Sequence, residues 1–267
     1  RPVGTPTKRS RLDHRRIRSN HPIMIELGTD FFIVASIMVF FIGVSKAGLA
    51  AGFGALGVPI FSLYMPPAMA AGILLPIMVV IDTTNLWNYR NHFQRQYLKI
   101  LILGALVGIG FGTMAFGVVR PEWLRVGVGV IALWFSALYF FRSYLPRISG
   151  KMPIKYGFFF AIVSGFTSHL AHAGGPPVRA FLLNQDLPKS QFIGTFGFLF
   201  ATINWMKMPP YLYFGQITRE TMYLSLILSA AVPFGVLVGL AVHKSLSQAL
   251  FTKIAYILLT FAGLRMI

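Results

Sequence analysis

A lysine and two histidines stand inside apolar stretches of this sequence, where an ionisable side chain is costly. Lys46 lies in the interrupted segment 43–59, and His169 and His172 lie in the interrupted segment 165–177. Ionisable groups within membrane-spanning sequence normally face a cavity or a partner. A lysine offers a positive charge to an anion, and a histidine can donate a hydrogen bond to it or carry a proton near neutral pH. These residue types therefore predict an anion-binding site.

Both interrupted segments combine glycines with prolines. The glycines that we assign to the site are Gly52, Gly54, Gly57, Gly174 and Gly175. Helix breaks persist in lipid where the freed backbone groups are buried in protein or line a cavity, and free amides at helix N-termini favour anions. Paired breaks in the two halves of a membrane protein indicate a transporter's binding site. Two kinks that only ease helix packing are the alternative.

Further polar residues lie near the two breaks. Asp82 is the one acid clearly inside an apolar span, where it can pair with Lys46 or relay a proton, and an interfacial carboxylate is the alternative. Asn85 and Asn204 stand at similar places in the two halves and are expected to orient an anion. Arg179, just after the second break, can contact the anion or reach lipid headgroups.

Some of these assignments have competing interpretations. His169 and His172 are three residues apart and share one face of a helix, so a metal ion is an alternative ligand. A metal needs further ligands, while Cys is absent and acids are few, so we expect neither a metal nor a cofactor. Packing roles stay open for both histidines, and Lys46 can instead extend toward a membrane surface.

The composition is typical of a membrane protein. The chain has 267 residues, of which 55% are hydrophobic and 12% are charged, and its mean hydropathy is +0.67. A soluble domain carries about 25% charged residues. We therefore predict an all-α polytopic membrane protein with about eight transmembrane segments of about 20 residues each. These segments are expected at 29–50, 68–89, 98–119, 123–142, 156–173, 189–207, 220–242 and 246–266.

The two halves of the chain share one design. Beginning at Gly43 and at Gly165, each half has a Gly/Pro-interrupted helix, a short apolar arm, a proline-marked turn and three further spans. This order predicts two four-segment membrane repeats, at 25–149 and 150–267, preceded by a basic tail at 1–24.

Much of the formal net charge of +17 lies in the tail. A basic tail before a long apolar segment is typical of a cytoplasmic anchor on anionic lipid, so we expect membrane lipid and no nucleic acid as its partner. A signal peptide is disfavoured by the length of the apolar segment and by the spans that follow. With eight crossings, the basic loops near Arg95 and Lys151 share the tail's side, and both termini are cytoplasmic. If the broken segments instead enter and leave by one face, the halves are inverted repeats and these loops lie opposite the tail.

The sequence resembles the sulfite exporter TauE/SafE family of membrane permeases from about Ile25 to the C-terminus. The resemblance rests on 43–48 leading to 57–59, on 172–177, and on the run 181–183 after it. It implies transport of sulfur-containing anions such as sulfite or organosulfonates, and a bacterial cytoplasmic (inner) membrane. The basic tail is outside the resemblance.

Lys46 and His172 fall within the matching motifs and are therefore implied as site residues, whereas Asp82 is not. No nucleotide-binding or serine-hydrolase motif is present, and we do not expect an enzyme. The expected protein is a permease that binds a small anion between the two breaks and alternates access around it, with a proton as the candidate coupling ion. An anion channel and an intramembrane metalloenzyme built on His169 and His172 are the rival interpretations.

Overall fold

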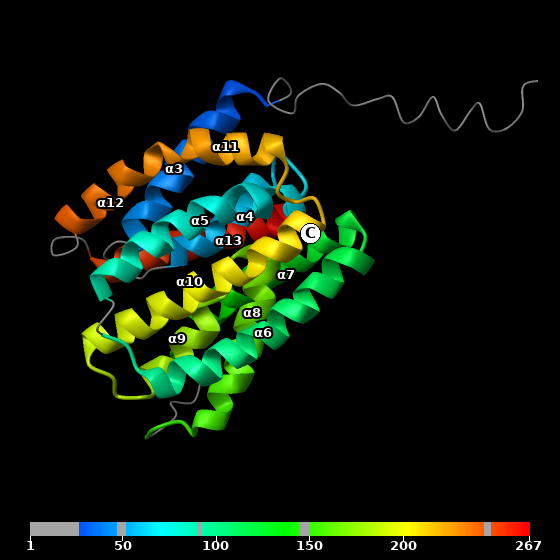
Figure 1. Cartoon of the computed structure of the whole chain (residues 1–267). Coiled ribbons are helices and arrows are strands. Elements are labelled where there is room, and N and C mark those ends of the chain that lie inside the picture. Colours follow the sequence, from blue (N-terminus) through cyan, green and yellow to red (C-terminus); the bar gives the residue numbers. More distant parts are fainter. Residues whose placement is uncertain (1–26, 47–51, 90–91, 145–149, 243–246) are drawn as a thin grey trace, which may run out of the picture.

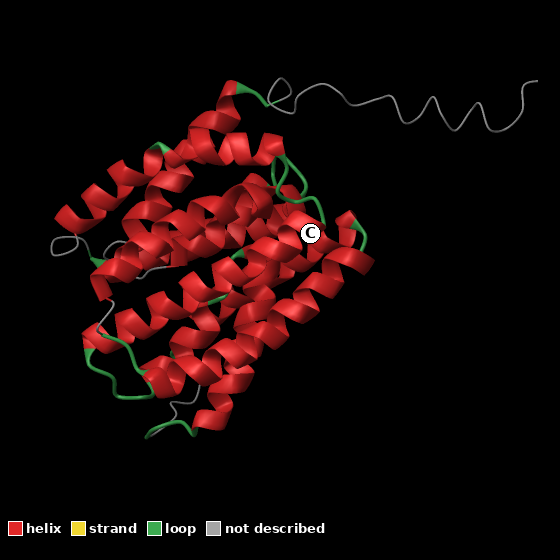
Figure 2. Cartoon of the chain, viewed as in Figure 1, coloured by secondary structure: helices red, strands yellow, loops and turns green. Residues whose placement is uncertain are grey.

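The computed structural model describes residues 27–46, 52–89, 92–144, 150–242 and 247–267, and its regular elements there are all helices (Figures 1 and 2). The first half contains α3 (Thr29–Val44), the 3-10 helix η2 (Gly52–Leu56), α4 (Gly57–Phe61), α5 (Pro67–Tyr89), α6 (Arg95–Val118) and α7 (Pro121–Phe140). The second half contains α8 (Ile154–Ala171), α9 (Gly175–Leu183), α10 (Lys189–Tyr213), α11 (Arg219–Ser229), α12 (Ala231–Val242) and α13 (Gln248–Met266). The tail at 1–24 lies outside the described residues.

Helix positions follow the apolar segments closely. Each of the eight predicted spans contains a helix, and the short pieces η2, α4 and α9 follow the two breaks. One predicted boundary is wrong, because α10 was expected to end at 207 and instead continues through Pro209 and Pro210 to Tyr213. A proline removes one backbone donor, but the amide's absence need not end a helix whose neighbours pack around it.

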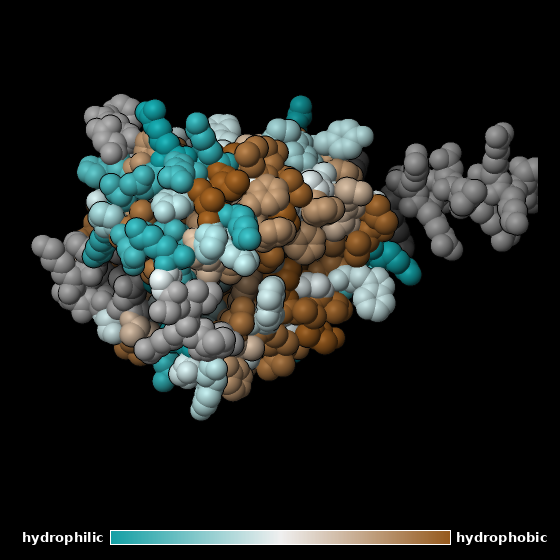
Figure 3. Space-filling model, turned by 90° about the horizontal axis from the view of Figure 1, so that it is seen from below, coloured by the Kyte–Doolittle hydropathy of each residue, from teal (hydrophilic) through white to brown (hydrophobic). Residues whose placement is uncertain are grey.

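Four described helices are long and apolar enough to cross a membrane: 95–118, 121–140, 219–241 and 249–266. The apolar helices Thr29–Val44 and Pro67–Thr83 are shorter. Large apolar side chains are exposed on the outer helices, as at Phe111 and Phe234. Figure 3 shows hydrophobic residues covering the middle and right of the surface, with hydrophilic residues gathered toward the left. These spans make the chain an integral membrane protein.

Glycines allow the closest helix contacts. A Cβ atom on Gly108 of α6 would lie 2.0 Å from the Ile162 carbonyl oxygen of α8. A Cβ atom on Gly235 of α12 would lie 2.2 Å from the Phe40 carbonyl oxygen of α3. Only a residue without a side chain allows the two backbones to approach so closely, as is common between helices in lipid. These contacts fix α8 and α3, the two helices that end at the breaks.

Each broken segment turns back on itself. The Gln185 side-chain amide, just beyond α9, donates to the Met152 carbonyl just before α8 at 3.0 Å. In the first half, the Phe31 ring at the start of α3 lies 5.6 Å from the Phe61 ring at the end of α4. The start and end of each broken segment are therefore neighbours, which agrees with entry and exit by one face.

The helix ends gather at two faces of the molecule. At the first, Gln94 before α6 donates its side-chain amide to Gln191 of α10 at 2.7 Å. We call this end, which also includes Met152 and Gln185, the Gln94 face. At the other end, Gly72 near the start of α5 lies against the Gln216 carbonyl that follows α10, and we call it the Gln216 face. Helices α5 and α10 run between these faces and pack against each other.

Candidate functional site

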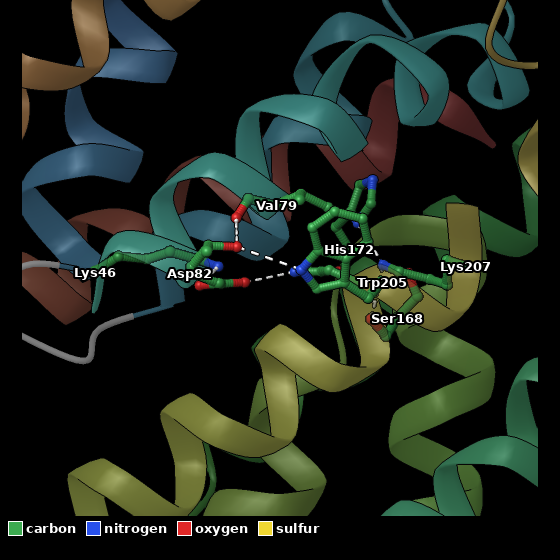
Figure 4. A network of polar contacts seen from close by, with 9 residues as sticks. Lys46, Val79, Asp82, Ser168, His172, Trp205 and Lys207 are labelled. Atoms are coloured by element: carbon green, nitrogen blue, oxygen red, sulfur yellow. Dashed lines mark hydrogen bonds and ion pairs between the residues drawn. The ribbon is translucent and has the colours of Figure 1, made fainter. Parts of the chain in front are cut away.

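Two clusters of polar side chains meet where α5 and α10 pack together (Figure 4). The first consists of Lys46, Asp82 and Asn204, and the second consists of Ser168, His172 and Lys207. Asn204 and Lys207 are one helical turn apart on α10, so the clusters are adjacent. All six side chains come from segments at or beside the two breaks or from the helices that follow them.

The first cluster is built around a buried carboxylate. Asp82 is 5% exposed on α5. One carboxylate oxygen forms an ion pair with the Lys46 ammonium, which follows α3. The other oxygen accepts a hydrogen bond from the Asn204 side-chain amide at 2.5 Å. Asp82 is therefore a buried counter-ion of Lys46, and its burial is tolerated because both carboxylate oxygens have partners.

The second cluster is built around Lys207, whose side chain is fully buried on α10. Its Nζ atom lies 3.1 Å from the Ser168 carbonyl oxygen, 3.1 Å from the Ser168 hydroxyl and 2.8 Å from His172 Nδ1. Three acceptors match the three N–H donors of a lysine ammonium. Unlike Lys46, Lys207 is held here by neutral groups.

The contacts of His172 define its tautomer. Its Nε2 atom lies 3.0 Å from the Ala71 carbonyl oxygen of α5, and a carbonyl can only accept. Nε2 therefore carries the proton, and Nδ1 of the neutral ring accepts from Lys207. One imidazole thus connects the second break to both central helices.

The backbone of His172 is strained. It follows α8 in the left-handed region, at φ 52° and ψ 23°, which costs a residue other than glycine about 1–2 kcal/mol. Its own amide still bonds the Ser168 carbonyl at 3.0 Å. Strain of this kind is retained at functional sites when neighbouring contacts hold it. The two ring contacts supply that restraint.

His169 faces a different direction from His172. Its ring lies against Gly112 and Phe116 of α6 and in edge contact with Tyr211. Nε2 is 3.4 Å from the Thr113 hydroxyl, while the buried Nδ1 has no hydrogen-bond partner. His169 therefore contacts α6 whereas His172 contacts α5, although both rings also lie against Tyr211, at 5.1 Å and 6.3 Å between ring centroids. Among the described residues, no group of three or more His, Asp or Glu is arranged to hold a metal.

The site glycines occupy the breaks themselves. Gly52 begins η2, while Gly57 begins α4 and packs against Leu74 of α5, where a Cβ atom would lie 2.7 Å from a leucine methyl group. Gly54 lies between them within η2 and has room for a Cβ atom.

In the second half, Gly174 precedes α9 and its carbonyl accepts a hydrogen bond from the buried Ser164 hydroxyl at 2.7 Å. Gly175 is the first residue of α9. Close packing accounts for Gly174, where a Cβ atom would lie 2.6 Å from the Ser164 carbonyl oxygen, but not for Gly175, where the nearest atom would be 3.7 Å away. The amides of both glycines remain a predicted contribution to anion binding.

The last two predicted residues are Arg179 and Asn85. Arg179 lies on α9 and lines a separate cavity with Arg142 and Tyr256. Asn85 lies on α5, but its side chain falls outside the described residues.

Sequence reasoning missed Lys207, Ser168 and Tyr211. The predicted span 189–207 places Lys207 at its last position, yet α10 continues through Pro209 and Pro210 and buries the side chain. An ionisable residue within an apolar segment was the available signal. Tyr211 donates its hydroxyl to the His169 carbonyl at 2.5 Å, and nothing in the local sequence marks that long-range contact.

Comparison with known proteins agrees with this architecture. A family model described as "Sulfite exporter TauE/SafE" matches residues 35–266. The searches of curated proteins and of solved structures gave no match. The family's members are membrane transporters and not enzymes. Since the matched region covers most of the chain, the protein belongs to the sulfite exporter TauE/SafE family.

Proposed function

We propose that this chain is a permease that binds a small anion, a sulfur oxyanion or an organosulfonate, between Lys46 and Lys207. The observation that carries the proposal is that two lysines, one from each half, flank a single Asp82–Asn204 pair in the interior. Ionisable side chains inside a membrane protein indicate an ion or substrate pathway. Membership of the TauE/SafE family supports a sulfur anion as the cargo.

The donors of the second cluster suit an oxyanion. Lys207 offers up to three N–H donors, which an anion's oxygens can accept in place of its neutral partners. His172 can turn from Ala71 to the anion and donate through Nε2. The amides of Gly174 and Gly175, at the start of α9, are the proposed third donor group.

Corresponding residues of the two halves are separated by a constant number of positions, as expected for two repeats of similar length. One separation of 122 residues relates Gly43 to Gly165, Asp82 to Asn204, and the first residue of α5 to that of α10. In this register Asn204 corresponds to Asp82, and not to Asn85 as the sequence suggested. Asp82 and Asn204 occupy the same position in the two halves and are hydrogen-bonded to each other. Such a contact between corresponding residues is expected on a symmetry axis, so it supports a pseudo-two-fold axis through this pair.

The helix contacts support the same register. Phe40 and Ile162 are also 122 residues apart, and each turns its carbonyl toward a glycine of the opposite half. Likewise α3 packs against α12 as α8 packs against α6. We propose that the halves 25–149 and 150–267 are the two repeats.

The proposed topology has six full crossings and two hairpins. The hairpins α3–α4 and α8–α9 open at opposite faces, since α5 starts at the Gln216 face and α10 at the Gln94 face. The halves are then inverted repeats with the start of α3 and the end of α13 on one side, in place of eight crossings. The start of α3 lies on the side opposite to the basic residues Arg95 and Lys151, so charge alone no longer decides which side is cytoplasmic.

Asp82 gives the site a route to proton coupling. In this structure the Asp82 carboxylate is paired with the Lys46 ammonium, so an incoming anion must compete with the carboxylate for Lys46. A proton on Asp82 removes the competing charge and leaves Lys46 available to the anion. We therefore propose that anion and proton bind together, with alternating access around the centre of the two repeats.

Uptake of labelled sulfite and small sulfonates into proteoliposomes tests this function. We expect saturable flux, acceleration of labelled uptake by unlabelled anion on the far side, and stimulation by an inward proton gradient. Flux that rises linearly without such counterflow would indicate an anion channel. Absence of flux for every sulfur anion, with correctly inserted protein, would withdraw the substrate class and leave the fold in place.

A further inference from the structure

A cavity of about 820 Å³ is lined by residues at or beside α7, α8, α9 and α13. None of the six residues of the two clusters lines it. One of its ends is at the Gln94 face, because Arg142 follows α7 by two residues and Ala249 lies in the first turn of α13. The inner end reaches Pro176 and Pro177, in the first turn of α9. The cavity therefore runs from a membrane surface toward the second break.

The outer end of this cavity is cationic. The Arg142 guanidinium lies 4.4 Å from the centre of the Tyr139 ring. The Tyr139 ring in turn stacks on Tyr256, with centroids 4.2 Å apart and planes 8° apart. Arg179 of α9 lines the same cavity as Arg142, Tyr139 and Tyr256. Arg142, just after α7, and Arg179 thus share this cavity with one stacked pair of rings.

The rest of the lining is apolar apart from Thr252, and several of its side chains are exposed at the outside of the protein. Trp134 is 48% exposed and Leu183 is 61% exposed. Phe160 and Leu138 add to the same wall. Among the described residues that line the cavity, none is acidic. In a membrane these exposed groups face acyl chains, since water is excluded there.

We propose that this cavity binds an anionic phospholipid, with the phosphate at Arg142 and Arg179 and an acyl chain along Trp134 and Leu183. The arginines match a phosphate, for which their planar donors are well suited. A free inorganic anion would contact only the arginines, whereas an amphiphile contacts both the arginines and the apolar wall. The volume is within the range of about 300–1,000 Å³ that suits organic ligands. Basic pockets between transmembrane helices bind such headgroups.

The site also has a consequence for α9. Pro176, Pro177 and Arg179 belong to that short helix, which directly follows the break at His172. A bound lipid in this cavity holds α9 against α7 and α13. The lipid site shares no side chain with the two clusters. The lipid proposal can therefore be tested independently of the proposed substrate.

Thermal unfolding of the full chain in detergent tests the proposal. Phosphatidylglycerol is added to one sample, phosphatidylcholine to another and glycerol 3-phosphate to a third. We expect phosphatidylglycerol to raise the unfolding midpoint by about 3 °C more than phosphatidylcholine, and glycerol 3-phosphate to have no effect. Equal effects of the two lipids, or a matching effect of glycerol 3-phosphate, would overturn the proposal.

Variants locate the effect. The double variant Arg142→Ala/Arg179→Ala should lose the preference for phosphatidylglycerol. Arg95→Ala/Lys99→Ala removes the same charge from exposed positions of the same face and should keep it. Ala180→Trp leaves both arginines in place and fills the cavity from α9, so it should also abolish the preference. Retention of the preference in either cavity variant would show that the lipid binds elsewhere.

Discussion

The two halves of the site hold their lysines in different ways. Lys46 is paired with the carboxylate of Asp82. Lys207 is surrounded by Ser168 and His172, which are neutral. An anion at Lys207 displaces no opposite charge, whereas an anion at Lys46 competes with a carboxylate. We infer that Lys207 makes the larger contribution to anion affinity and that Lys46 links anion binding to the state of Asp82.

The largest expected effect is on Lys207. Lys207→Met keeps the length of the side chain but removes its donors, and we expect sulfite uptake to fall about 100-fold, as for loss of a charged hydrogen bond. Lys46→Met should reduce uptake about 10-fold, because its charge is already shared with Asp82. Lys99→Met, at an exposed lysine of α6, serves as the control and should transport normally. Equal losses for Lys46→Met and Lys207→Met would remove the distinction between the two lysines.

The second prediction concerns the stability of the ion pair. Asp82→Asn leaves Lys46 without its carboxylate and should cost about 2 kcal/mol, less than for a fully buried pair because the Lys46 side chain is 20% exposed. The thermal midpoint in detergent should fall by about 5 °C. The double variant Asp82→Asn/Lys46→Met should recover most of that loss. If it is as unstable as Asp82→Asn alone, the pair is not the cause.

The third prediction compares the glycine contacts of the two halves. Gly108→Ala and Gly235→Ala each force two backbones apart, and each should cost about 2 kcal/mol. Gly110→Ala is a matched control, since a Cβ atom there has no neighbour within 4 Å. It should match or exceed the wild-type midpoint, because alanine favours helix. A neutral Gly108→Ala would mean that α6 and α8 are not held by close backbone approach.

The smallest expected effect is at His169. His169→Phe removes Nδ1, which has no partner, and the long 3.4 Å contact of Nε2 with the Thr113 hydroxyl, which keeps its hydrogen bond to the Ile109 carbonyl. Uptake should therefore change less than about 2-fold and the midpoint should not fall. His172→Phe removes both ring contacts and should reduce uptake about 10-fold. Parallel uptake and unfolding measurements on the two variants check this. A larger loss for His169→Phe would reverse the roles of the histidines.

Local hydropathy was enough to predict the helices of this fold. The eight apolar segments each contain a helix because about 20 apolar residues in lipid must satisfy their backbone internally. Hydropathy does not tell a hairpin from a crossing, however. That distinction depends on long-range contacts such as Gln185 with Met152. The topology therefore had to come from tertiary structure.

The candidate site was predicted in part. Lys46, Asp82, Asn204 and His172 were found because polar residues within apolar sequence are rare and costly. Lys207 was missed because the predicted span ends at it, whereas α10 continues through the proline pair to Tyr213. The partner of His172 is a backbone carbonyl, at Ala71, and no sequence pattern marks such an acceptor.

Equilibrium binding of labelled sulfite to the purified protein tests the central claim most directly. We predict one anion per chain, displaced by small sulfonates, with affinity lowered in both Lys46→Met and Lys207→Met and more strongly in the latter. Lys99→Met should bind as the wild type does. Binding of sulfite with unchanged affinity to Lys207→Met would contradict the account, because the anion would then be held elsewhere.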